Sequence, residues 1–290
     1  MPSTIMEAAN ISSEFLREKK IPSYRLDAEI IVAKILNIKR MDIYLLHDRP
    51  ISDPEWKKIL ALIEQRGEFF PTAYITGEKE FRSIELHVSE SVLIPRPETE
   101  LLVDETLSIV NELREDLKSQ PNILEIGTGS GAISLALALE LDDPKIAATD
   151  ISNEAISVAD LNFKAYRVND RIRLFMGDLY NALKGHDEKF DIIVSNPPYV
   201  STDEMRTLPA DVKYEPEIAL FGGTGGLDIT RPLIEGAPDH LEPGGFLVVE
   251  IGKDQVEKVK EIISKTTNLK FSHITKDYSG HHRILVAKRM

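Results

Sequence analysis

Residues 122–140 read NILEIGTGSGAISLALALE, and they give the strongest indication of the architecture. The stretch begins with a short apolar run, passes through three glycines within five residues, and continues into a longer apolar segment of helical length. A strand, a tight turn and a helix in direct succession are typical of a parallel α/β sheet, and glycines at the turn let a ligand approach the backbone closely. The stretch therefore predicts a ligand-binding turn after the strand Ile123–Ile126.

The same alternation of strand-like and helix-like segments continues to the C-terminus. It is typical of a mostly parallel sheet covered on both faces, whose ligands sit beyond the carboxyl ends of the strands. The later segments are KIAATD (145–150), NEAISVADLNFKAY (153–166), RIRLFMGD (171–178), FDIIVS (190–195), FLVVEIG (246–252) and RILVAK (283–288). We expect an α/β domain with its site at that edge of the sheet.

The N-terminal part of the chain has a different pattern. From Ser3 to about Gly67 apolar residues recur at helical spacing, whereas residues 77–94 alternate with period two before a further helical stretch begins at about Pro97. The predicted organisation is an all-α domain (1–76), a linker of β-hairpin and helix (77–119), and the α/β domain (120–290).

Composition excludes several classes of function. The chain has 35 basic and 48 acidic residues, a formal net charge of -13, which opposes sequence-independent attachment to nucleic acid. Without cysteine there is no disulfide, no cysteine zinc site and no thiolate nucleophile. No apolar run approaches the about 18 residues of a membrane span, and the first twenty residues lack a continuous apolar core. We expect a cytoplasmic protein that binds neither metal, membrane nor nucleic acid directly.

Two acids at strand ends indicate a nucleoside cofactor. Asp150 ends the second strand of the α/β domain, where an acid can meet ribose hydroxyls, and Asp178 closes the third, where it and the backbone of Leu179 can bind an adenine amino group. The glycine turn also satisfies the dinucleotide pattern GxGxxA through Gly127, Gly129 and Ala132. A nicotinamide-dependent dehydrogenase therefore stays a candidate on these residues alone.

The fourth strand delivers Asn196-Pro197-Pro198-Tyr199 to the same edge. The prolines lack N–H groups and hold their predecessors in extended geometry, so this loop is a rigid source of acceptors. The Asn196 side-chain oxygen and the Pro197 carbonyl can hold the two hydrogens of a planar NH2 group, while Tyr199 packs against its face. Such a nitrogen is a poor nucleophile, so catalysis should rest on orientation and near-attack placement, as in methyl transfer from a sulfonium.

The combination of EIGTGSG, Asp150, Gly177-Asp178 and NPPY resembles the class I S-adenosylmethionine-dependent methyltransferases that modify planar NH2 groups. Within them the chain is similar to the HemK/PrmC family of release-factor glutamine N5-methyltransferases, and the similarity covers nearly the whole chain. Further matching segments are YITGEKEF (74–81), IPRPETE (94–100), YEPEIALFGGTGGLD (214–228), LEPGGFLVVEIG (241–252) and DYSGHHR (277–283).

The resemblance implies a role for each motif. Gly127, Thr128, Gly129, Ser130 and Gly131 would embrace the methionine part of S-adenosyl-L-methionine, Asp150 its ribose, and Asp178 with Leu179 its adenine. Asn196, Pro197, Pro198 and Tyr199 would hold the substrate glutamine, with Asn196 also next to the cofactor. The implied substrate is the glutamine of the GGQ motif in class 1 peptide chain release factors, gripped with help from the helical N-terminal domain. The implied second product is S-adenosyl-L-homocysteine.

Three other functions stay open. A sister enzyme that methylates a glutamine of a ribosomal protein shares every residue named above. An adenine N6 DNA methyltransferase applies the same loop to a flipped base but needs a basic groove, which the net charge of -13 disfavours. A non-catalytic nucleoside-binding module is disfavoured by the intact acceptor loop. Arg96, Glu98 and Glu215 are expected either to shape the cleft or to anchor the linker to the α/β domain.

Overall fold

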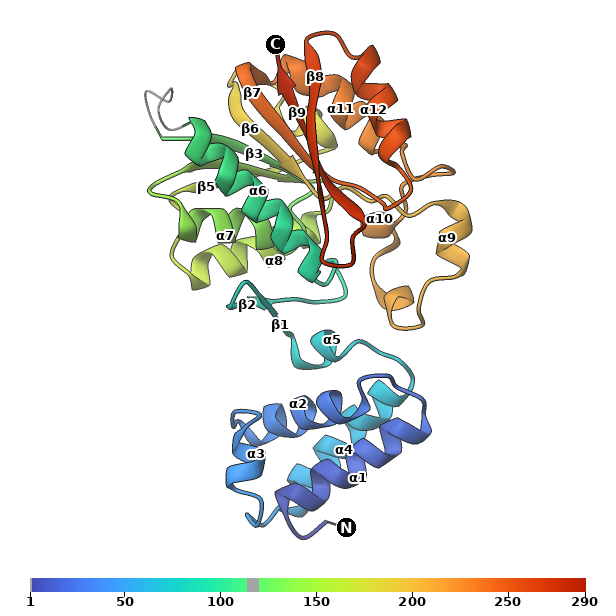
Figure 1. The fold of residues 1–290 in the computed structure, drawn as a ribbon. Coiled ribbons are helices and arrows are strands. Elements are labelled where there is room, and N and C mark those ends of the chain that lie inside the picture. The colour runs from blue at the N-terminus through green and yellow to red at the C-terminus, as the bar shows by residue number, and fades with distance from the viewer. Residues whose placement is uncertain (1, 114–119) are drawn as a thin grey trace. The chain divides into compact units, whose positions relative to one another are not determined.

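The computed structural model describes residues 2–113 and 120–290 (Figure 1). By its internal contacts the chain forms two units: Met1–Glu78 with Pro209–Tyr214, and Lys79–Leu208 with Glu215–Met290. Met1 of the predicted N-terminal domain and residues 114–119 of the predicted linker lie outside the described residues. The predicted combination of a helical N-terminal region with a mixed α/β region is confirmed.

The first unit is built from helices. They are α1 (Ile5–Glu18), α2 (Tyr24–Leu36), α3 (Asp42–Leu45), α4 (Asp53–Gly67) and α5 (Thr72–Thr76). α4 begins with a capping box, in which Ser52 and Glu55 each bond the other's backbone N–H, which satisfies two donors that the first turn leaves unpaired. Aliphatic side chains fill its core, and a buried ion pair of 2.7 Å between Arg66 and Asp27 joins α4 to α2.

A short segment from the second half of the chain also belongs to this unit. The residues Pro209–Tyr214, which include the 3-10 helix η2 (Val212–Tyr214), follow α9 (Thr202–Arg206) and precede α10 (Glu217–Leu220). The Tyr214 hydroxyl donates to the Glu68 carbonyl at 2.9 Å, and its ring meets Phe70 edge to face with centroids 5.2 Å apart. The first unit is therefore made from two separate stretches of sequence.

The second unit is organised around a seven-stranded sheet in the order β5-β4-β3-β6-β7-β9-β8. The strands are β3 (Asn122–Ile126), β4 (Lys145–Asp150), β5 (Ile172–Met176), β6 (Phe190–Ser195), β7 (Leu241–Glu250), β8 (Leu269–Lys276) and β9 (His282–Arg289). The first five strands in this order are parallel, and β9 runs antiparallel to both of its neighbours, β7 and β8. The chain order reverses between β3 and β6, which is where ligands bind in such sheets.

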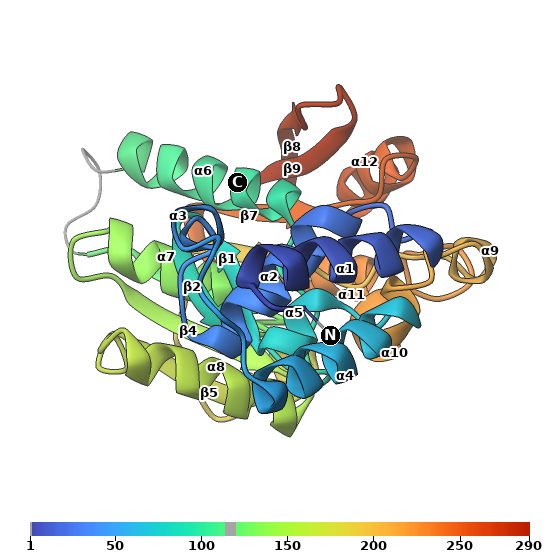
Figure 2. The ribbon, with the colours of Figure 1, turned by 90° about the horizontal axis from the view of Figure 1, so that it is seen from below.

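Helices cover both faces of this sheet (Figures 1 and 2). α6 (Pro97–Leu113), α7 (Ala132–Glu140) and α8 (Asn153–Ala165) neighbour one another on one face, and α11 (Thr230–Gly236) and α12 (Val256–Lys265) pack on the other. The strands between them are almost continuously buried, as expected for a parallel sheet with two covered faces. Two further 3-10 helices are η1 (Leu179–Leu183) and η3 (Ala237–Asp239). No helix within residues 2–113 and 120–290 could span a membrane.

The predicted hairpin is formed by β1 (Glu78–Phe81) and β2 (Ile84–His87). Polar side chains of the α8 region bind β2 through its backbone. Asn162 accepts from the His87 N–H at 2.8 Å and donates to the His87 carbonyl at 2.9 Å. The Tyr166 hydroxyl bridges the N–H and carbonyl of Glu85 in the same way. Strand β2 is therefore fixed to the second unit by four hydrogen bonds.

Candidate active site

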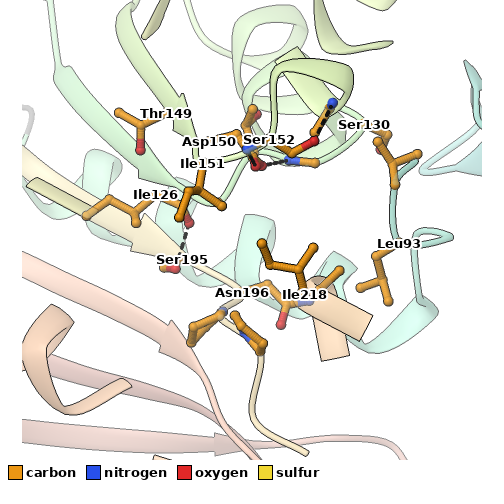
Figure 3. Close-up of a pocket in the computed structure, with 18 of the residues that line it drawn as sticks. Leu93, Ile126, Ser130, Thr149, Asp150, Ile151, Ser152, Ser195, Asn196 and Ile218 are labelled. Carbon is orange, nitrogen blue, oxygen red and sulfur yellow. Dashed lines mark hydrogen bonds between the residues drawn. The ribbon is translucent and has the colours of Figure 1, made fainter. Parts of the chain in front are cut away.

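A cavity opens at the carboxyl ends of the parallel strands, as the sequence predicted for a ligand site in this fold (Figure 3). The strand registers explain why. Ile126, the last residue of β3, is level with Thr149 of β4 and Ser195 of β6, so the loops after these strands leave the sheet at one edge. Of the residues proposed from sequence, the cavity is lined by Gly127, Thr128, Gly129, Ser130, Asp150, Asp178, Leu179, Asn196, Pro197 and Pro198.

Two glycines of the turn after β3 have different surroundings. A Cβ atom on Gly129 would meet nothing within 4 Å, so this part of the turn borders open space in the cavity. A Cβ atom on Gly131 would lie 2.6 Å from a ring carbon of Phe163 on α8. Gly131, with a φ of +82°, is therefore required for the packing of the turn against α8, behind the cavity wall.

Asp150 ties the glycine turn to the end of β4. Its Oδ2 accepts from the Gly129 N–H at 2.8 Å and its Oδ1 accepts from the Ser152 N–H at 2.9 Å (Figure 3). Burial raises the pKa of the carboxyl group, and these backbone N–H groups oppose that rise. Each oxygen keeps acceptor capacity, because a carboxylate oxygen accepts more than one hydrogen bond. Asp150 can therefore organise the turn and receive hydroxyl donors from the cavity at once.

The loop after β5 continues this wall. The Gly177 N–H donates to the Asp150 carbonyl at 2.8 Å, which extends the pairing of β4 and β5 to the cavity edge. Leu179 then adopts a φ of +47°, an uncommon conformation for a residue with a side chain, at the start of η1. Such conformations persist only where the surrounding structure enforces them, so the backbone of Asp178 and Leu179 is tightly specified.

Glu125 is a buried acid directly behind the glycine turn. Its Oε2 accepts from the Thr128 hydroxyl at 2.8 Å and from the Ser134 N–H at 3.1 Å, and also from the Ser134 hydroxyl. Burial raises the pKa of Glu125 to about 7, and the hydrogen bonds to Ser134 and Thr128 limit the rise. Within the described part of the chain, Oε1 has no hydrogen-bond partner. Sequence reasoning missed this residue, although an acid inside the apolar run NILEI was a signal for it.

Asn196 begins a series of hydrogen bonds that runs through Thr99, which also lines the cavity, to Glu250 behind the cavity wall. Its Nδ2 donates to Thr99 Oγ1 at 3.0 Å, and that hydroxyl donates to Glu250 Oε2 at 2.8 Å. The Tyr199 hydroxyl donates to Glu250 Oε1 at 3.2 Å. Tyr199, unlike Asn196, is not among the described residues that line the cavity. Thr99 and Glu250 were not proposed from the sequence, because only the fold brings α6, β6 and β7 together here.

Burial governs the titration of this cluster. Glu250 is 1% exposed, and its burial raises its pKa to about 6 although Thr99 and Tyr199 donate to it. The pKa of Tyr199 is also raised, first by burial and then by the adjacent Glu250 carboxylate. At pH 8 the cluster therefore holds an ionised Glu250 and a neutral Tyr199 hydroxyl.

The glycine cluster GGTGG (residues 222–226) packs against the loop formed by residues 196–199, here called the acceptor loop. A Cβ atom on Gly222 would lie 2.6 Å from the Pro198 carbonyl oxygen, so the two backbones touch. Gln255 Nε2 donates to the carbonyls of Tyr199 and Gly226, both at 2.9 Å. Gly222 and Gly226 have to be glycines because the backbone of Pro198 and Tyr199 lies directly against them.

Arg96, which follows the cavity-lining residue Pro95, forms an ion pair with Glu215. Glu215 is buried, and its Oε2 also accepts from the Ile94 N–H at 3.1 Å. These contacts fasten the segment before α6 to the loop before α10. Of the two roles considered for Arg96 and Glu215, this geometry favours anchoring. Glu98 is half-buried and its charge raises the pKa of Glu250.

A parallel sheet with this strand order, an antiparallel end and a glycine turn after its first strand defines the class I methyltransferase fold. A solved methyltransferase from Pyrococcus furiosus has the same fold, with a TM-score of 0.52 at 22% identity over 72% of this chain and 91% of that one. Residues 7–77 match the family model described as PrmC N-terminal domain, and residues 103–210 match the methyltransferase small domain.

Curated relatives resolve the family. The chain is 37% identical to the release factor glutamine methyltransferase of Rhodopirellula baltica over 285 residues, 98% of this chain and 96% of that protein. It is also 37% identical to the protein of the same name from Aquifex aeolicus, over 93% of this chain and 94% of that one. The chain therefore belongs to the release factor glutamine methyltransferase family, as the sequence motifs indicated, and it is a methyltransferase.

Proposed function

We propose that this protein transfers a methyl group from S-adenosyl-L-methionine to the side-chain nitrogen N5 of the glutamine in the GGQ motif of class 1 release factors. The observation that carries the proposal is the meeting of the glycine turn and the Asn196-Pro197-Pro198 loop in one cavity. One loop suits a nucleoside cofactor, and the other suits a planar NH2 group. The names of the relatives point to the same reaction.

The residues present fit S-adenosylmethionine. The open turn at Gly129 leaves room for the methionine part, and Asp150, which lines the cavity, has spare acceptor capacity for ribose hydroxyls. Asp178 and Leu179 would hold the adenine. When bound, the cofactor supplies a methyl group on a positively charged sulfur. The negative charge of Asp150 favours such a cation nearby.

The acceptor loop would work by orientation. The Asn196 side-chain oxygen and the Pro197 carbonyl would accept the two hydrogens of the glutamine amide, which points the face of its nitrogen toward the methyl donor. The nitrogen gains the methyl group, loses one proton to water, and the sulfur keeps the electron pair of the broken bond. No strong base is required, because the nitrogen becomes acidic as the new bond forms.

The partner follows from the same proposal. The helical unit, predicted to comprise residues 1–76, would help to bind the release factor. The GGQ loop of the release factor would then reach the cavity. The net charge of -13 is compatible with a protein substrate and opposes binding to nucleic acid, as expected from the sequence.

Mass spectrometry on a purified class 1 release factor tests the proposal. After incubation with this protein and S-adenosylmethionine, one methyl group on the GGQ glutamine is expected, and none on a factor whose GGQ glutamine is replaced by alanine. An unmodified factor, together with methylation of a ribosomal-protein glutamine or of DNA adenine in parallel reactions, would assign the site to another substrate.

A further inference from the structure

We infer that Thr99 and Glu250 are positioning residues that fix which end of the Asn196 side-chain amide faces the substrate group that receives the methyl. Neither residue would touch the reacting atoms. The inference rests on the proposed function, in which the methylated group is an NH2. Such a group donates hydrogen bonds, so the oxygen of the Asn196 amide, and not its nitrogen, has to face the substrate.

The geometry is a relay of two hydrogen bonds across three elements. Asn196 follows β6, Thr99 lies in the first turn of α6, and Glu250 ends β7. The Asn196 Nδ2 to Thr99 Oγ1 distance is 3.0 Å, and the Thr99 Oγ1 to Glu250 Oε2 distance is 2.8 Å. Glu250 is buried and lies outside the cavity lining, whereas Thr99 is buried at the cavity wall, and each of the two side chains has a protein partner for its hydrogen bond.

The direction of the relay follows from the number of hydrogens. An ionised carboxylate only accepts, and a threonine hydroxyl has a single hydrogen. Thr99 must therefore donate that hydrogen to Glu250, which leaves its oxygen as an acceptor toward Asn196. An acceptor can bind only the NH2 end of the Asn196 amide. The reversed amide would place two oxygens in contact with no hydrogen between them, so Asn196 Oδ1 is held away from Thr99 and available to a substrate NH2.

The direction of the relay holds while Glu250 is ionised, and the groups around Glu250 determine the pH range in which it is. The Tyr199 hydroxyl donates to the second carboxylate oxygen, the Arg283 guanidinium on β9 favours the ionised form, and Glu98 on α6 opposes it. Arg283 is itself paired with Asp277 at 2.9 Å. While Glu250 is ionised, Thr99 donates its hydrogen to Glu250 and Asn196 donates an Nδ2 hydrogen to Thr99. Once Glu250 is protonated, Thr99 no longer has to donate to it, and the orientation of Asn196 is no longer enforced.

Kinetics of Thr99 variants with a release factor provide the first test. Thr99→Val keeps the shape but removes the hydroxyl, and kcat is expected to fall about tenfold, the effect of one buried hydrogen bond, while the Kd for S-adenosylmethionine changes less than about twofold. Thr99→Ser restores the hydroxyl and is expected to recover most of kcat.

The matched control is Thr106→Val. Thr106 is fully buried in the same helix, and its hydroxyl donates to the Leu102 carbonyl of that helix at 2.8 Å. This variant is expected to stay within about twofold of the wild type, because its hydroxyl serves only the helix. If Thr99→Val and Thr106→Val have the same kcat, the inference is wrong.

Nuclear magnetic resonance separates this inference from the identity of the substrate. In protein labelled with ¹⁵N-asparagine, the side-chain NH2 signal of Asn196 is assigned by its loss in Asn196→Ala. We expect this signal to move in Thr99→Val, to stay in place in Thr106→Val, and to shift with pH around 6 as Glu250 titrates. A signal insensitive to Thr99→Val would overturn the inference. A wild type that methylates no release factor but shows the expected shifts would overturn only the proposed function.

Discussion

Asp150 and Gly129 are joined by a 2.8 Å hydrogen bond in which the backbone N–H donates to the carboxylate. The acid proposed from sequence as a ribose ligand is thus also a support for the turn proposed to hold the methionine part of the cofactor. The two functions of Asp150 cannot be separated by removing its side chain, and predictions for this residue have to include both.

Asp150→Ala is expected to weaken cofactor binding more than it lowers kcat. Loss of the carboxylate removes the acceptors for ribose and leaves the Gly129 and Ser152 N–H groups without their partner, at about 1.5–3 kcal/mol for hydrogen bonds to a charged group. Isothermal calorimetry with S-adenosylmethionine measures the change in Kd. Asp150→Asn keeps one acceptor oxygen and should lose less affinity. An unchanged Kd in Asp150→Ala would remove Asp150 from the cofactor site.

Asn196→Ala is expected to lower kcat by about tenfold to a hundredfold with a much smaller change in cofactor affinity, because it removes one of the two acceptors that orient the amide. Asn196→Asp should not rescue it. The only hydrogen of Thr99 is directed at Glu250, so an aspartate at 196 would face the Thr99 oxygen without a donor. Single-turnover kinetics and calorimetry on both variants check this, and an equal loss of turnover and affinity in Asn196→Ala would contradict it.

Glu125 should make stability depend on pH. Its pKa is about 7 in the folded protein, compared with the ordinary value of 4.5 for a glutamate side chain, so the folded state binds the proton more tightly. The free energy of unfolding then falls as pH rises from about 4.5 to about 7, by up to about 3 kcal/mol. Other acids titrate in this range, so urea denaturation of the wild type is compared with Glu125→Gln at each pH. The difference between the two proteins should change across this window, and a constant difference would be inconsistent with the raised pKa.

Gly222→Ala is expected to disturb the acceptor loop. The new methyl carbon would lie 2.6 Å from the Pro198 carbonyl oxygen and 2.8 Å from the Tyr199 Cα, so the loop has to move. We expect about 1–3 kcal/mol of destabilisation from overpacking and a fall in kcat of at least about tenfold, since small displacements of orienting groups are costly in rate.

Gly225→Ala is the matched control for Gly222→Ala. It lies in the same glycine cluster, but a Cβ atom there would meet nothing within 4 Å. Thermal unfolding and methylation kinetics of the two variants give the comparison. Similar kcat values for both would show that the contact between Gly222 and Pro198 is unimportant.

Features within one stretch of sequence were predictable. The glycine turn, Asp150 and the loop from Asn196 each follow a strand directly, so the parallel sheet brings them to one edge. What the sequence did not reveal depends on contacts between distant residues. Thr99 and Glu250 are 151 positions apart, and Gln255 reaches the Tyr199 carbonyl across 56 positions. A local pattern has no information on such pairs, although the acid in NILEI could have been noticed. The structure places most of these residues at one cavity. The cofactor and substrate roles assigned to them, and to Gly131 and Tyr199 outside its lining, stay predictions.

The discontinuous first unit affects how the protein can be dissected. A chain cut after residue 78 would lack Pro209–Tyr214, and with it the ring of Tyr214 that packs on Phe70. The remaining chain would in turn display that segment without its partners. Chimaeras that exchange the first unit between relatives therefore have to transplant two stretches of sequence together. In a family alignment, Phe70 and Tyr214 should change in a correlated way.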